Sequence, residues 1–91
     1  MVIVNLLIEF PLPFVNGLKG RRAVLNSIKE KLKKFNLSVL DISGEYPKEA
    51  ALAVVFAAFD EKYAHKIIQK IEETLFRNFP EYSFEISYEM L

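Results

Sequence analysis

The sequence predicts an α+β sandwich in which two helices cover one face of a four-stranded antiparallel sheet. Four segments have the apolar, β-branched character of strands, and two have the three-to-four-residue period of amphipathic helices. Their order is β-α-β-β-α-β, which divides the chain into two βαβ halves. This is the split βαβ, or ferredoxin-like, arrangement, and right-handed crossovers place the first and third strands in its centre. A chain of 91 residues forms one such domain, residues 1–91.

The first half of the chain contains the first predicted strand and helix. Val2–Phe10 is almost continuously apolar, which is typical of a strand in the middle of a sheet, and Pro11 ends it. The first helix is predicted from Gly17 to about Phe35, because apolar residues recur there every three or four positions. Arg21 occupies a place in this apolar stripe where a hydrophobic residue is expected.

The remaining elements follow with short connections. Leu37–Ile42 is predicted to be a short strand, and Ala50–Phe59, apolar on both faces, a central one. Asp60 is expected to cap a second helix that ends near Asn78. Tyr82–Met90 alternates between apolar and polar residues, which predicts a half-exposed edge strand.

Charge is distributed very unevenly along the chain. Residues 17–35 hold seven of the twelve basic residues and one acid, Glu30, which gives this stretch a local charge of +6. The rest of the chain carries −6, so that a formal net charge of zero conceals a polarised molecule. A surface with one predominant sign of charge attracts partners of the opposite sign. The first helix is therefore expected to bind an anionic partner.

The basic residues of the first helix form a candidate anion-binding or RNA-binding site. Lys19, Arg21 and Arg22 lie at the helix N-terminus, where free backbone N–H groups and the helix dipole favour a phosphate. Lys29 and Lys33 would extend the track along the helix. Such binding would be tolerant of sequence and sensitive to salt. The alternative is that Lys19 and Arg22 are only solvated, and that the Arg21 stem covers the edge of the core.

The composition argues against most enzyme classes. The chain has no cysteine and a single histidine, His65, so it offers no Cys–His pair, zinc site or triad. No catalytic residue, metal or cofactor is predicted. An acylphosphatase-like phosphate loop is an outside alternative, in which Gly17, Gly20 and Arg21 or Arg22 would hold phosphate. No signal peptide and no apolar run of ~20 residues is present, so a cytoplasmic protein without a membrane partner is expected.

The sheet face away from the helices gives a second functional hypothesis. Its centre is predicted to be apolar, with Ile3, Leu7 and either Phe56 or the set of Val55 and Phe59. An apolar centre with a polar rim is typical of a protein interface, and the last strand could pair with another edge. A homodimer or another protein complex is therefore the alternative to RNA binding.

Several segments resemble the YlxP-like family, a bacterial domain of unknown function. The segments that carry the resemblance are Leu12-Pro13, Gly17-Leu18-Lys19-Gly20-Arg21-Arg22-Ala23-Val24, Phe35-Asn36-Leu37-Ser38-Val39 and the apolar strand that ends in Asp60. Two departures are Gly20, where the family usually has glutamate, and Tyr46-Pro47, near a tryptophan common in the family. The resemblance implies no established activity. Genes of the family often lie beside those for translation initiation and ribosome maturation factors, which implies a role linked to RNA or the ribosome.

These observations together predict a small non-enzymatic binding module. Its expected partner is RNA or a ribonucleoprotein, bound through the first helix. Base stacking on the sheet, as in an RNA-recognition motif, is not expected, because Glu85 and Glu89 on the outward edge of the last strand would repel phosphate.

Overall fold

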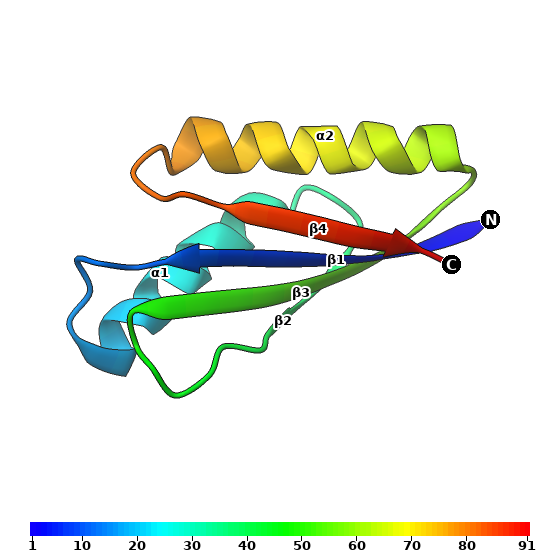
Figure 1. Ribbon diagram of the computed structural model, residues 1–91. Helices are drawn as coiled ribbons and strands as arrows, with labels where there is room; N and C mark the ends of the chain where they lie inside the picture. Colours follow the sequence, from blue (N-terminus) through cyan, green and yellow to red (C-terminus); the bar gives the residue numbers. More distant parts are fainter.

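The structure, a computed structural model that describes residues 1–91, has the predicted order of elements and the predicted topology (Figure 1). The elements are β1 (Val2–Pro11), α1 (Gly17–Leu32), β2 (Ser38–Asp41), β3 (Glu49–Ala58), α2 (Glu61–Asn78) and β4 (Glu85–Met90). The strands form one antiparallel sheet in the order β2-β3-β1-β4, with both helices over one face. The ferredoxin-like α+β prediction is confirmed.

The two long central strands determine the register of the sheet. β1 pairs with β3 from Val2 opposite Ala58 to Pro11 opposite Glu49, and β4 adds to the other side of β1. Backbone hydrogen bonds in both directions between Ile3 and Leu91, at 3.0 and 2.8 Å, bring the two ends of the chain together (Figure 1).

The core lies between the sheet and the helices and follows from strand alternation. Every second residue from Val4 to Phe10 in β1 and from Ala50 to Ala58 in β3 faces the helices and is buried, because successive side chains of a strand point to opposite faces. The helices contribute residues spaced by three or four positions, in agreement with their predicted stripes. The largest fully buried members of the core are Val4, Leu6, Ile8, Leu12, Leu25, Ile28, Leu32, Leu52, Val54, Ile71 and Leu75.

Helix ends differ from the prediction at α1 and agree with it at α2. α1 ends at Leu32 rather than near Phe35, because the N–H groups of Lys33 and Phe35 turn back to the carbonyls of Glu30 and Leu32 in a tighter turn. The predicted cap of α2 is confirmed, since the Asp60 carboxylate accepts a hydrogen bond of 2.8 Å from the Tyr63 N–H. Neither helix is long and apolar enough to cross a membrane.

β4 begins at Glu85 rather than at Tyr82, so the predicted strand was three residues too long at its start. The residues before Glu85 pack through side chains instead of ladder hydrogen bonds. The Phe10 ring lies 5.5 Å from the Tyr82 ring and 4.7 Å from the Phe84 ring. Alternation alone does not distinguish such an aromatic cluster from a strand.

Candidate nucleic-acid interface

Arg21 is a buried structural residue, and this separates it from the other four predicted site residues. Its side chain is only 9% exposed, and its Nη1 donates to the carbonyl oxygens of Tyr46 at 2.9 Å and Glu49 at 3.1 Å. The guanidinium thereby ties α1 to the connection between β2 and β3. Because its Nη1 is engaged inside the protein, we take Arg21 out of the candidate phosphate site and out of any acylphosphatase-like loop.

The other four predicted residues, Lys19, Arg22, Lys29 and Lys33, form what we call the basic stripe of α1. Lys19, Arg22 and Lys33 are exposed, and Lys29 is half-buried. The distance from Lys19 to Lys33 along the helix is ~21 Å at a rise of 1.5 Å per residue. Lys33 makes the one ion pair of the chain, with Glu30 at 3.2 Å, between two well-exposed side chains. An exposed pair of this kind is weak, so the stripe keeps most of its positive charge.

Besides Glu30, a second carboxylate, that of Asp41, lies near the stripe. Burial acts to raise the pKa of Asp41, but hydrogen bonds from Ser43, which include its N–H at 2.9 Å, and the charges of Arg21 and Lys29 outweigh this effect. The pKa of Asp41 is consequently below its ordinary value. Asp41 therefore stays ionised and offsets part of the positive charge at Lys29, while Lys19 and Arg22 lie beyond it along α1.

The N-terminus of α1 has no anionic group of its own. Asn16 precedes the helix without making a side-chain cap, Gly17 has a positive φ of 72°, and the first turn contains no acid. The second helix differs, since it starts with the Asp60 cap and Glu61. The first N–H groups of a helix have no partner within the helix and carry partial positive charge. At α1 this charge adds to that of Lys19 and Arg22.

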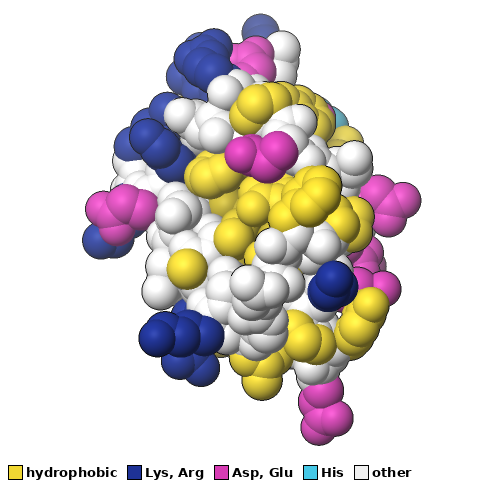
Figure 2. Space-filling view, turned by 90° about the vertical axis from the view of Figure 1, so that its left-hand side faces the viewer, with side chains coloured by type: hydrophobic (Ala, Val, Ile, Leu, Met, Phe, Trp, Pro, Cys, Tyr) yellow, Lys and Arg dark blue, Asp and Glu magenta, His cyan; other side chains and the backbone are white.

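The two sides of the molecule differ in their balance of charge. Figure 2 looks at the end where the β1–α1, β2–β3 and α2–β4 connections lie. Lysine and arginine side chains gather on the left flank and at the top, carboxylates are more frequent on the right, and hydrophobic side chains lie between them (Figure 2). The left flank belongs to the helix layer and the right flank to the open face of the sheet. The charge imbalance along the sequence is thus an imbalance between two faces.

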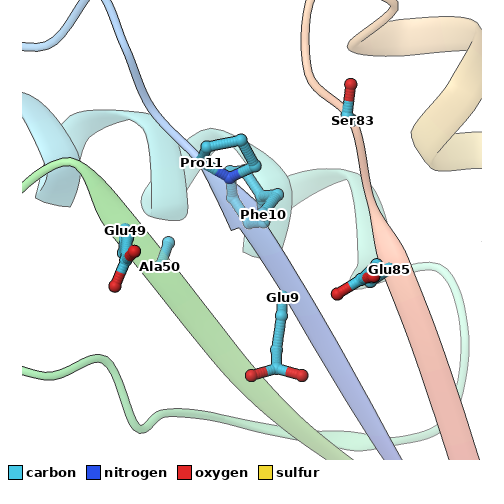
Figure 3. Close-up of a pocket in the computed structure, with 7 residues that line it drawn as sticks. All are labelled: Glu9, Phe10, Pro11, Glu49, Ala50, Ser83 and Glu85. Atoms are coloured by element: carbon cyan, nitrogen blue, oxygen red, sulfur yellow. The ribbon is translucent and has the colours of Figure 1, made fainter.

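The acidic end of the open face is a hollow of about 420 Å³ with three carboxylates on three strands. Glu9 lies opposite Glu85 in the register, and Glu49 comes from β3 (Figure 3). The Glu85 carboxylate points towards β1, and no cationic side chain lines the hollow (Figure 3). No group of three or more histidines, cysteines or carboxylates in the structure is arranged to hold a metal ion. This end of the sheet repels phosphate.

The rest of the open face combines apolar residues with the polar residues Asn5, Ser87 and Glu89. Leu40 is 65% exposed and Val55 42%, and Ile42 is also exposed. Leu7 and Ala53 line a shallow hollow beside Ile42. The sequence left open whether Phe56 or the set of Val55 and Phe59 lies on the open face. Val55 is exposed on this face, and Phe56 is buried.

Sequence reasoning missed a groove between the residues that follow α1 and the side of α2 that carries Tyr63 and Arg77. It is lined by Lys34 and Phe35 after α1 and by Tyr63, Lys70 and Arg77 on α2. The spacing of Tyr63, Ile67, Lys70, Thr74 and Arg77 alternates between four and three, which places them on one side of a helix. This spacing is visible in the sequence. Its significance could be recognised only once the position of the end of α1 beside α2 was known.

Comparison with known proteins identifies a family whose function is unknown. The model of the family DUF503, described as a protein of unknown function, matches residues 3–87. No curated protein matches the chain. Among solved structures, the de novo designed protein Foldit4 is similar with a TM-score of 0.56 and 16% identity, over 97% of this chain and 94% of that chain. This likeness supports the fold and carries no information on function.

Proposed function

We propose that this chain, which belongs to the DUF503 family of proteins of unknown function, is a non-enzymatic module that binds RNA or a ribonucleoprotein through the basic stripe of α1. The separation of charge between the two faces carries the proposal. Four cations follow one side of a helix for ~21 Å, and the carboxylates of Glu9, Glu49 and Glu85 occupy the opposite face. An RNA strand is attracted to one face and repelled by the other.

The expected mode of binding is contact with phosphates. Lysine and arginine side chains neutralise backbone charges without reading base edges, so the binding is tolerant of sequence. Arg22 can hold a phosphate through two parallel N–H groups, whereas each lysine acts as a point charge. The uncapped N-terminus of α1 adds backbone donors beside Lys19. The resemblance to the YlxP-like family, with its translation-linked gene neighbours, supports the same class of partner.

The test is to measure binding of a fluorescent RNA pool to three versions of the protein at low salt. The stripe variant has Lys19→Gln, Arg22→Gln and Lys29→Gln, and the matched control has Lys48→Gln, Lys62→Gln and Lys66→Gln. Both variants lose three positive charges. We expect wild type and control to bind with micromolar affinity and the stripe variant to bind at least tenfold more weakly, since each phosphate contact contributes to affinity. Equal affinities of the stripe variant and the control would contradict the proposal.

A second candidate function is self-association through the open face. Leu40 and Val55 are large apolar side chains with high exposure on adjacent strands, and an apolar patch of this kind favours an interface. Three of the carboxylates on this face, Glu9, Glu49 and Glu85, lie together at one end. Two copies related by a two-fold axis can therefore join their apolar parts while the acidic ends stay apart.

If the open face is a dimer interface, one charged substitution in it should dissociate the dimer. We expect Val55→Lys to convert a dimeric wild type into a monomer with an unchanged circular dichroism spectrum, because a buried lysine in the interface would be unpaired. Light scattering coupled to gel filtration measures the mass, and Lys62→Ala on the helix side is the control. A wild type that is monomeric at high concentration excludes this function.

A further inference from the structure

The groove between the two helices is hollowed and carries mixed aromatic and cationic side chains. Its volume is about 560 Å³, within the range of ~300–1,000 Å³ found for ligand pockets. It is also larger than the carboxylate-lined hollow of the open face. The groove begins directly after the basic stripe, because Lys34 follows Lys33 in the chain. An RNA strand that lies along α1 would thus reach the groove at the end of the helix.

The floor and the walls of the groove differ in chemistry. Thr74 is buried in the floor, and its hydroxyl already donates to the Lys70 carbonyl at 2.8 Å. Ile67 is half-buried beside it, so the floor offers apolar surface without an unpartnered polar group. The walls carry Lys34, Lys70 and Arg77 against one acid, Glu73. The groove therefore has an excess of positive charge around an apolar floor.

Aromatic rings border the same groove. Tyr63 is 48% exposed at the start of α2, and Phe35 is half-buried at the end of α1. The Lys34 ammonium lies 5.3 Å from the centre of the Phe35 ring, which holds this cation at the rim of the groove. Tyr63 is the more accessible ring and has a free surface on which a planar group can stack.

We propose that this groove takes an unpaired nucleotide of the bound RNA, with the base against Tyr63 and an adjoining phosphate near Lys70, while Lys34 and Arg77 contact phosphates further along the strand. The inference rests on the proposed function, because the basic stripe brings the strand to the groove. Bases in a duplex are stacked on each other and cannot enter, so the groove gives the protein a preference for single strands. Stacking depends little on base identity, so this preference adds no strong sequence specificity.

The test compares two oligomers of equal length and charge, a single-stranded RNA of mixed sequence and a chain of abasic ribose phosphates. Wild type is expected to bind the RNA about tenfold more tightly than the abasic chain. Tyr63→Ala should remove this difference by weakening RNA binding alone, and Tyr63→Phe should retain it. The alanine variant keeps the backbone N–H that Asp60 caps, so α2 is expected to remain intact. Tyr88→Ala is the matched control, because Tyr88 is 45% exposed on β4, away from the groove.

Each outcome decides between the two proposals. If wild type binds both oligomers equally, and Tyr63→Ala changes neither affinity while the stripe variant loses both, the groove proposal is overturned and the proposed function stands. If wild type binds neither oligomer at low salt, the proposed function is overturned, and the groove proposal with it.

Discussion

Arg21→Met is expected to lower the free energy of unfolding by about 2–4 kcal/mol. The Arg21 guanidinium, on a residue that is only 9% exposed, donates to the carbonyls of Tyr46 and Glu49, and methionine leaves both carbonyls without that donor. A hydrogen bond from a charged donor contributes about 1.5–3 kcal/mol, and two are lost. The Tyr46 carbonyl still accepts from the Glu49 N–H, so the total loss is smaller than the sum of the two. Methionine preserves the straight apolar stem and the helix propensity, so that the effect reports on the guanidinium.

Urea unfolding followed by circular dichroism measures this difference. Arg22→Met is the matched control, because Arg22 is the next residue of the same helix, is exposed, and should change stability by no more than about 0.5 kcal/mol. Arg21→Lys should recover only part of the loss, since an ammonium lacks the planar fork of a guanidinium. Equal stabilities of Arg21→Met and Arg22→Met would show that Arg21 has no structural role.

The affinity of wild-type protein for single-stranded RNA is expected to fall about 50-fold between 50 and 200 mM monovalent salt. Each phosphate contact on a single strand contributes ~0.7 to the slope of log affinity against log salt, so four contacts from the basic stripe give about −2.8. The stripe side chains are mostly exposed and none is held in a strong ion pair, so they are free to make these contacts. Fluorescence anisotropy over this range measures the slope, and a slope near zero would contradict phosphate binding.

The fold could be predicted because its signals are local. Strand alternation, helical periodicity and the Asp60 cap each depend on a few neighbouring residues, and element order then leaves few topologies. The errors occur at the ends of elements. α1 ends early because the N–H groups of Lys33 and Phe35 bond to carbonyls three and not four residues back, and the residues before β4 pack as an aromatic cluster around Phe10.

The candidate site could be predicted only in part, because its contacts join parts of the chain that are distant in sequence. An arginine in an apolar stripe was a clear sign that Arg21 is unusual, but the sequence did not show which groups it meets. Its partners, Tyr46 and Glu49, are 25 and 28 residues away, in a loop whose position depends on the completed sheet. Tyr63 and Lys70 likewise gain significance only from their position beside the end of α1.

The most direct test of the account is the difference in salt slope between wild type and the stripe variant with Lys19, Arg22 and Lys29 changed to glutamine. The removal of three phosphate contacts should reduce the magnitude of the slope by about 2, and the matched control at Lys48, Lys62 and Lys66 should retain the wild-type slope. That result would establish the basic stripe of α1 as the RNA-binding surface. A slope that is the same in wild type and the stripe variant would show that RNA binds elsewhere or not at all.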